Sequence, residues 1–61
     1  MKKIIKNMAQ CRKCGDIIES TKRVGAVKCS CGSISVEGGK HYIKRGGNKE
    51  DIIELSEYEE I

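Results

Sequence analysis

Short apolar runs separated by glycine and polar residues mark this chain of 61 residues. The apolar side chains are mostly isoleucine and valine, a set that favours strands. We predict strands at residues 16–20 and 26–28, joined by a polar loop at 21–25. Ile4 and Ile5 lie in a lysine-rich segment that can pair as an edge strand or remain irregular. The pattern predicts a small antiparallel β domain.

The clearest local pattern is a hairpin around Gly38-Gly39, a dipeptide that suits a two-residue turn. It predicts strands at 33–37 and 40–44, with Val36 opposite His41. One face would then carry Ile34, Val36, His41 and Ile43, and the other Ser33, Ser35, Glu37, Lys40, Tyr42 and Lys44. Such a hairpin is amphipathic, as a half-buried sheet requires.

The C-terminal segment has a different spacing. Ile52, Leu55, Tyr58 and Ile61 recur on one side at near-helical intervals, which predicts a short C-terminal helix. Asn48, three residues before Asp51, resembles a helix N-cap. A frayed acidic tail is the alternative, because isolated helices this short are marginal.

Composition leaves little material for a core, since the chain has no Phe, Trp or Pro and only one leucine. A domain of this length buries only about 60% of its unfolded surface and usually needs a disulfide, a metal or a partner. No apolar stretch has the length of a signal peptide or a membrane span. We therefore expect a cytoplasmic protein with no role at a membrane. The cytoplasm keeps thiols reduced, which favours metal binding over disulfides.

Four cysteines form the constellation with chemical meaning: Cys11, Cys14, Cys29 and Cys31. They follow a C-x2-C pattern, then 14 residues, then C-x-C, with a glycine after each pair. Structural zinc takes four ligands tetrahedrally and favours thiolate. We predict one structural Zn²⁺ in a zinc ribbon, with two knuckles joined by a hairpin. The chain then divides into a lysine-rich lead-in (1–10), the zinc-ribbon domain (11–47) and an acidic helix or tail (48–61).

Other uses of the cysteines are weaker alternatives. A disulfide framework allows three connectivities, and a Cys29–Cys31 bridge would be strained. An iron–sulfur site also uses four cysteines, whereas a redox C-x-x-C would need a βαβ pattern that is absent here. The predicted hairpin places His41 away from Cys31, so we do not expect it as a ligand. A closed four-thiolate site leaves no open position for substrate, so we expect no catalytic residues and no enzyme activity.

Charge is unevenly distributed along the chain. Residues 1–49 carry 12 basic and 3 acidic residues, whereas residues 50–61 carry 6 acidic residues and none that are basic. An aromatic residue flanked by positive charge can stack a base and hold phosphates, and the candidate partner face of this type is Lys40, Tyr42, Lys44 and Arg45. A solvated lysine face is the simpler interpretation. The acidic segment either folds against the basic body or imitates a phosphate backbone.

The motifs C-R-K-C-G-D-I-I-E-S, C-S-C-G, V-E-G-G-K-H-Y-I-K-R-G-G and I-I-E-L-S-E-Y, taken together, resemble an uncharacterised family. Its members are small zinc-ribbon-like proteins of Firmicutes-type bacteria and their phages. The resemblance implies a four-cysteine zinc ribbon and no established activity. Its phage association favours a small protein that modulates host machinery.

Three functions are consistent with these observations. The first is a non-enzymatic adaptor that binds a protein and modulates host transcription, nucleic-acid processing or defence. The second is direct nucleic-acid binding through the candidate partner face. The third, which we favour least, is a redox or metal-transfer role. No small-molecule substrate is expected.

Overall fold

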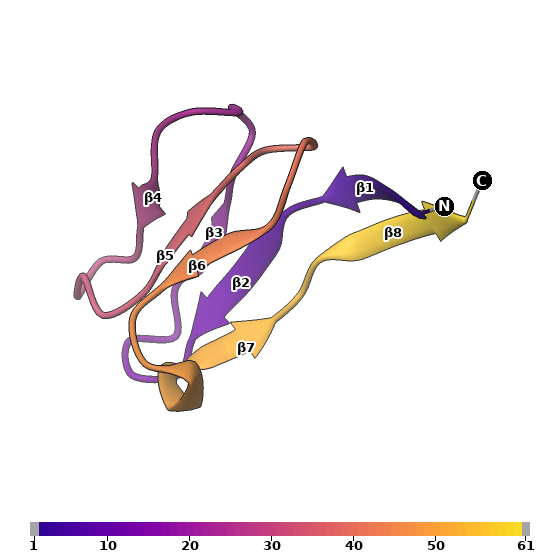
Figure 1. Cartoon of the computed structure of the whole chain (residues 1–61). Helices are drawn as coiled ribbons and strands as arrows, with labels where there is room; N and C mark the ends of the chain where they lie inside the picture. Colours follow the sequence, from indigo (N-terminus) through magenta and orange to yellow (C-terminus); the bar gives the residue numbers. More distant parts are fainter. Residues whose placement is uncertain (1, 61) are drawn as a thin grey trace.

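The computed structural model describes residues 2–60, so Met1 and Ile61 lie outside it; within that range the chain forms eight short strands (Figure 1). The strands are β1 (Lys2–Lys6), β2 (Met8–Cys11), β3 (Ile17–Glu19), β4 (Val27–Lys28), β5 (Ser35–Glu37), β6 (Lys44–Gly46), β7 (Ile52–Glu54) and β8 (Glu57–Glu60). All pairings are antiparallel, which confirms the predicted small antiparallel β domain. No helix within residues 2–60 is long and apolar enough to cross a membrane.

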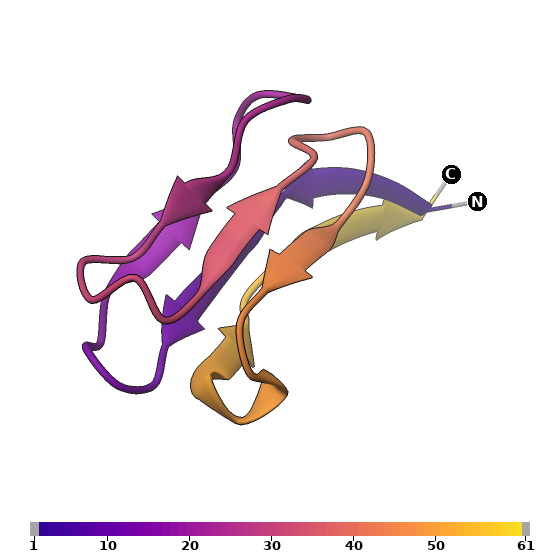
Figure 2. The ribbon, with the colours of Figure 1, turned by 60° about the vertical axis from the view of Figure 1, so that its left-hand side comes forward.

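The strands form three sheets, in the orders β3-β2-β7, β4-β5-β6 and β1-β8. The two three-stranded sheets lie against each other, and the β1-β8 ribbon projects from one end of the molecule (Figures 1 and 2). The buried cluster draws on both three-stranded sheets: Ala9, Cys11, Ile18, Cys29, Ile34 and Val36, with Ile52 packed against it. Two of these six buried residues are cysteines, so the purely hydrophobic part of the core is very small.

Residues 16–20 and 26–28 contain the predicted strands, as β3 and β4, but these strands do not pair with each other. β3 pairs with β2, and β4 pairs with β5. Each cysteine pair therefore lies in the turn of its own hairpin. The connection between β3 and β4 crosses from one sheet to the other, in place of the hairpin predicted between the two knuckles.

The predicted register of the Gly38-Gly39 hairpin is wrong. Val36 pairs with Arg45 instead of His41, and the two strands are joined by a six-residue loop at 38–43. Lys40 lies in this loop rather than on a strand. His41, predicted on the buried face, is exposed.

A distant asparagine accounts for the longer loop. The amide nitrogen of Asn7 lies within hydrogen-bond distance of the backbone oxygens of Glu37 (3.2 Å), Gly39 (2.8 Å) and Tyr42 (3.1 Å). The hydroxyl of Ser20 also accepts a hydrogen bond from the Gly39 N–H. The loop thus wraps around a buried side chain, and this tertiary contact overrides the local turn preference of the two glycines.

The predicted C-terminal helix is wrong as well. Only a 3-10 turn at Lys49–Asp51 forms, and the Asn48 side chain makes no capping hydrogen bond. The rest of the described tail is β7, paired with β2, and β8, paired with β1. Ile61, part of the helical spacing, lies outside the described residues. Strand pairing satisfies the backbone polar groups of this segment, whereas a helix this short would be marginal.

We call the two-stranded ribbon of β1 and β8 the arm. Its register places Lys2 opposite Glu60 and Lys3 opposite Glu59. Lys6 pairs with Glu57, and their charged atoms lie 3.8 Å apart. Of the two alternatives for the acidic segment, the structure therefore has it folded against the lysine-rich segment. The arm is nonetheless open to solvent on both strands.

Candidate metal centre

The four cysteine sulfurs converge at one end of the two three-stranded sheets. All four Sγ atoms lie within 4.8 Å of one another. Cys31 Sγ lies 3.6 Å from Cys11 Sγ and 3.6 Å from Cys29 Sγ. A disulfide would bring two sulfurs to about 2.05 Å, whereas a tetrahedral site with zinc–sulfur bonds of about 2.3 Å separates them by about 3.8 Å. The cluster can therefore hold a metal ion.

The first knuckle follows directly from β2. Cys11 ends that strand, and its N–H donates to the carbonyl of Asp16 at 2.8 Å. The N–H of Gly15 closes the turn by donating to the Cys11 carbonyl at 2.8 Å. Gly15 has a φ of 78°, in the left-handed region that glycine occupies readily. The N–H of Cys14 points at the Cys11 sulfur, 3.5 Å away.

The second knuckle repeats this plan with one residue fewer between its two cysteines. The N–H of Cys29 donates to the carbonyl of Ile34, five residues later, as Cys11 does to Asp16. Gly32 donates to the Cys29 carbonyl at 3.0 Å and has a φ of 74°. The short C-x-C spacing is therefore compatible with a knuckle.

Asp16 joins the two knuckles and was not recognised from the sequence as part of the site. Its carboxylate accepts hydrogen bonds from the N–H of Ser30 at 2.9 Å and from the Ser30 hydroxyl at 2.7 Å. These bonds, first that of the hydroxyl, lower the pKa of Asp16. Ser30 is the single residue between Cys29 and Cys31. A carboxylate just after the first pair and a serine inside the second were the available signals.

Each pair contributes one buried and one exposed thiol. Cys11 and Cys29 are 1% and 5% exposed, whereas Cys14 and Cys31 face solvent. Hydrogen bonds from the side chain and backbone of Ser33 lower the pKa of Cys31 to about 6. For Cys11, the backbone N–H of Cys14 lowers the pKa, but burial and the neighbouring thiols outweigh it and raise it to about 11. The buried pair fixes the cluster in the core, and the exposed pair completes it at the surface.

Two basic residues of the first knuckle hold the 3-10 turn. The N–H of Arg12 donates to the carbonyl of Asp51 at 2.8 Å, and its Nε donates to the carbonyl of Glu50 at 2.9 Å. The ammonium of Lys13 lies 3.7 Å from the Asp51 carboxylate. These contacts dock the segment that leads into β7 beside the cysteine cluster.

Arg45, predicted on the candidate partner face, is held inside the molecule. Its side chain is only 13% exposed and forms a bidentate pair with Glu54, at 2.8 and 2.6 Å. It also donates to the side-chain oxygens of Asn7 and Ser56 and to the carbonyl of Met8. Arg45 thus ties β6 to the junctions between β1 and β2 and between β7 and β8.

The other three residues of that face remain at the surface. Lys40 and Lys44 are exposed, and Tyr42 is 40% exposed. The Tyr42 hydroxyl donates to the carbonyl of Arg23 at 3.2 Å, which brings the basic loop at 21–25 beside it. The structure therefore separates Arg45 from the predicted set and places other basic residues near Tyr42.

The sequence model of one protein family, described as Domain of unknown function (DUF7695), matches residues 3–47. The matched region contains all four cysteines and ends before the 3-10 turn. No curated protein and no solved structure matches the chain. Together with the cysteine cluster, the family match fits a small metal-binding domain.

Proposed function

The chain belongs to the family described as Domain of unknown function (DUF7695), and we propose that it is a zinc-stabilised binding module without catalytic activity. The convergence of four sulfurs within 4.8 Å is the observation that carries the metal assignment. Thiolate is the donor that tetrahedral zinc favours, and the two hairpin-borne knuckles are consistent with a zinc ribbon.

Zinc would have a structural role in this site. Four thiolates fill the tetrahedron and leave no position for water or substrate. Binding of structural zinc contributes on the order of 10–16 kcal/mol to folding. Because two of the six buried core residues are themselves ligands, the metal is expected to dominate the stability of the domain.

Metal content is tested by native mass spectrometry and by cobalt substitution. We expect one zinc ion per chain and a cobalt spectrum of a tetrahedral tetrathiolate site. Cys14→Ser should give the cobalt spectrum of a site with three thiolate ligands, whereas Ser30→Ala should keep the spectrum of a site with four. A chain that folds without metal, or one that carries an iron–sulfur chromophore, would contradict the assignment.

The binding function we propose is recognition of another protein through the arm. The arm projects from the body (Figure 1) and exposes two large apolar side chains, Ile5 at 40% and Tyr58 at 46%. Apolar side chains on a projecting ribbon suit a protein interface. The resemblance to phage-borne proteins implies a partner in host transcription, nucleic-acid processing or defence, in the cytoplasm.

Cross-linking in the cell of origin tests this function. The zinc-loaded protein should capture a specific partner, and the double substitution Ile5→Ser and Tyr58→Ser should abolish capture without loss of zinc. Val24→Ser is the matched control, because Val24 is 74% exposed on a different loop. Equal capture by all three proteins, or none by any, would refute the function.

Nucleic-acid binding is the second candidate, and the contact between two basic loops favours it. A Cβ on Gly39 would lie 2.9 Å from the backbone of Lys22, and Tyr42 is bonded to Arg23. These loops together present Lys22, Arg23, Lys40 and Tyr42. Affinity for single-stranded DNA or RNA should fall as the salt concentration rises. At a fixed salt concentration, Tyr42→Ala should lower the affinity further, whereas the control Lys49→Ala should leave it unchanged. No binding at low salt would end this proposal.

A further inference from the structure

We propose that the outer edge of β1 binds an extended acidic segment of another protein as an added strand. This inference rests on the proposed protein-binding function, and it names the surface and the chemistry of the partner.

The outer edge of β1 is open. β2 is paired on both sides, with β3 and β7, whereas within residues 2–60 β1 pairs only with β8. β3 ends at Glu19, and the N–H of Ser20 makes a last hydrogen bond to the carbonyl of Asn7 at 2.8 Å. The chain then turns away. Within residues 2–60, the place beside β1 that a longer β3 would occupy therefore holds no strand, and backbone N–H and C=O groups of β1 face it on either side of the irregular pairing between Ile4 and Lys6.

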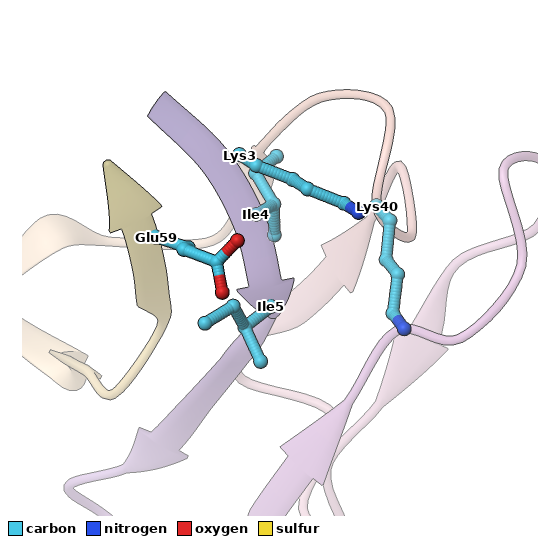
Figure 3. A pocket seen from close by; sticks show the side chains of 5 residues that line it. All are labelled: Lys3, Ile4, Ile5, Lys40 and Glu59. Atoms are coloured by element: carbon cyan, nitrogen blue, oxygen red, sulfur yellow. The ribbon is translucent and has the colours of Figure 1, made fainter. Parts of the chain in front are cut away.

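Two adjoining hollows lie beside β1, and the first reaches over a face of the arm from Glu59 of β8 to Lys40. Their volumes are about 210 and 350 Å³, and Ile5 and Lys40 line both. In the first, Lys3 and Lys40 lie on one side and Glu59 reaches in from β8, with Ile4 and Ile5 between them (Figure 3). The second continues past Lys6 to the end of β3. The edge is thus bordered by a groove with an exposed isoleucine at its centre.

The charge along the groove selects the occupant. In the first hollow two lysines, Lys3 and Lys40, lie with one carboxylate, Glu59, which leaves an excess of positive charge. In the second, Lys40 lies near Glu19, and Lys6 is already paired with Glu57. Edge lysines discourage pairing with another copy of the same basic strand. They favour a strand with acidic residues, and Ile5 favours an apolar side chain among them.

The arm itself supplies the precedent for this chemistry. The inner edge of β1 already pairs with Glu57–Glu60, an acidic strand with one tyrosine. A two-stranded ribbon is only marginally stable in water, and a third strand on the free edge would complete a stable sheet. The free edge offers the same lysine-rich strand to a second segment of this type.

Titration of the ¹⁵N-labelled, zinc-loaded full chain with a synthetic peptide tests the proposal. The probe has the sequence of residues 52–60, acetylated and amidated, and its two controls replace Tyr58 by proline or every glutamate by lysine. We expect saturable amide shifts in β1 and loop 38–43 with the probe alone, while β8 amides keep their exchange protection. The double substitution Lys3→Glu and Lys40→Glu should weaken binding about tenfold, and Lys49→Glu should leave it unchanged.

Several results would overturn the inference. They are no saturable shift up to about 1 mM probe, equal binding of either control peptide, and displacement of β8. Concentration-dependent shifts of β1 without peptide would show that a second copy occupies the edge instead. If the probe fails while capture of a partner still depends on Ile5 and Tyr58, the proposed function stands and only this inference falls.

Discussion

At the scale of single residues, Asn7 joins parts of the chain that are far apart in sequence. The residue is 1% exposed, and its amide nitrogen lies within hydrogen-bond distance of three carbonyl oxygens of the 37–42 segment. Its side-chain oxygen accepts a hydrogen bond from Arg45 at 2.8 Å. Buried polar groups need such partners, because an unsatisfied one keeps its full desolvation cost. Asn7 therefore fixes the loop shape and the position of Arg45 together.

Asn7→Ala is expected to lower the unfolding free energy of the zinc-loaded protein by about 2–3 kcal/mol, because it leaves buried carbonyls and a guanidinium N–H without partners. The matched control is Asn48→Ala, since Asn48 is exposed and makes no capping bond. It should change the free energy by less than about 0.5 kcal/mol. Urea unfolding at fixed free zinc measures both, and similar losses in the two variants would contradict this role.

Glu54 gives the fold a dependence on pH. Partial burial raises the pKa of its carboxyl, but hydrogen bonds from Arg45 and Ser56 and the charge of Arg45 outweigh it and hold the pKa below its usual range. A carboxyl whose pKa is lowered on folding stabilises the protein above the unfolded pKa of about 4.3. That stabilisation is lost as the pH falls through the folded value.

We therefore expect Glu54→Gln to cost about 0.5–1 kcal/mol at neutral pH, a small effect because the Glu54 side chain is 45% exposed. The gap between wild type and variant should narrow as the pH falls toward the unfolded pKa of about 4.3. Urea unfolding in excess zinc measures this difference, and Glu50→Gln serves as an exposed control. If the difference in unfolding free energy stays constant or widens on acidification, the Arg45–Glu54 pair is not its source.

At the scale of elements, residue spacing predicts the features that depend only on neighbouring residues. The cysteine pairs with their glycines, and the strands containing Ile18 and Val27, are apparent from local pattern alone. The Gly38-Gly39 hairpin was mispredicted because the amide of Asn7, about thirty residues away, holds the loop open. No local pattern marks that asparagine among its lysine neighbours.

The tail was mispredicted for a related reason. Its apolar residues fit a helix, but a helix of this length lacks enough internal hydrogen bonds to persist alone. The free edge of β2 and the lysines of β1 offer it backbone partners and opposite charges instead. Strand pairing between the two ends of a chain is a long-range event that periodicity does not report.

Removal of residues 57–61 tests the independence of the arm. Ser56 is retained because its hydroxyl oxygen accepts hydrogen bonds from the N–H of Met8 and from Arg45. We expect β1 amides to lose hydrogen-exchange protection, while β2 amides and the binding of one metal ion stay unchanged. Loss of metal binding on truncation would show instead that the arm and the cysteine cluster fold as one unit.

At the scale of the whole molecule, the cysteine cluster and the arm differ in how deeply they are buried. Cys11 and Cys29 of the cluster belong to the core, whereas β1 and β8 are mostly exposed along their length. Chelation of the metal is therefore expected to unfold the whole chain, with loss of the sheet signal in circular dichroism and recovery on adding zinc. Retention of the sheets after full chelation would mean that the core suffices without metal.

The pairing of Lys2 with Glu60 has a consequence for how this domain can be connected. Because the two described ends leave the same tip of the arm (Figure 2), a short glycine linker could join them into a cyclic backbone with little strain. Cyclisation restricts the unfolded chain and should raise the midpoint of thermal unfolding. For the same reason the domain could be inserted into a surface loop of an unrelated protein, entering and leaving at one point without spreading its host.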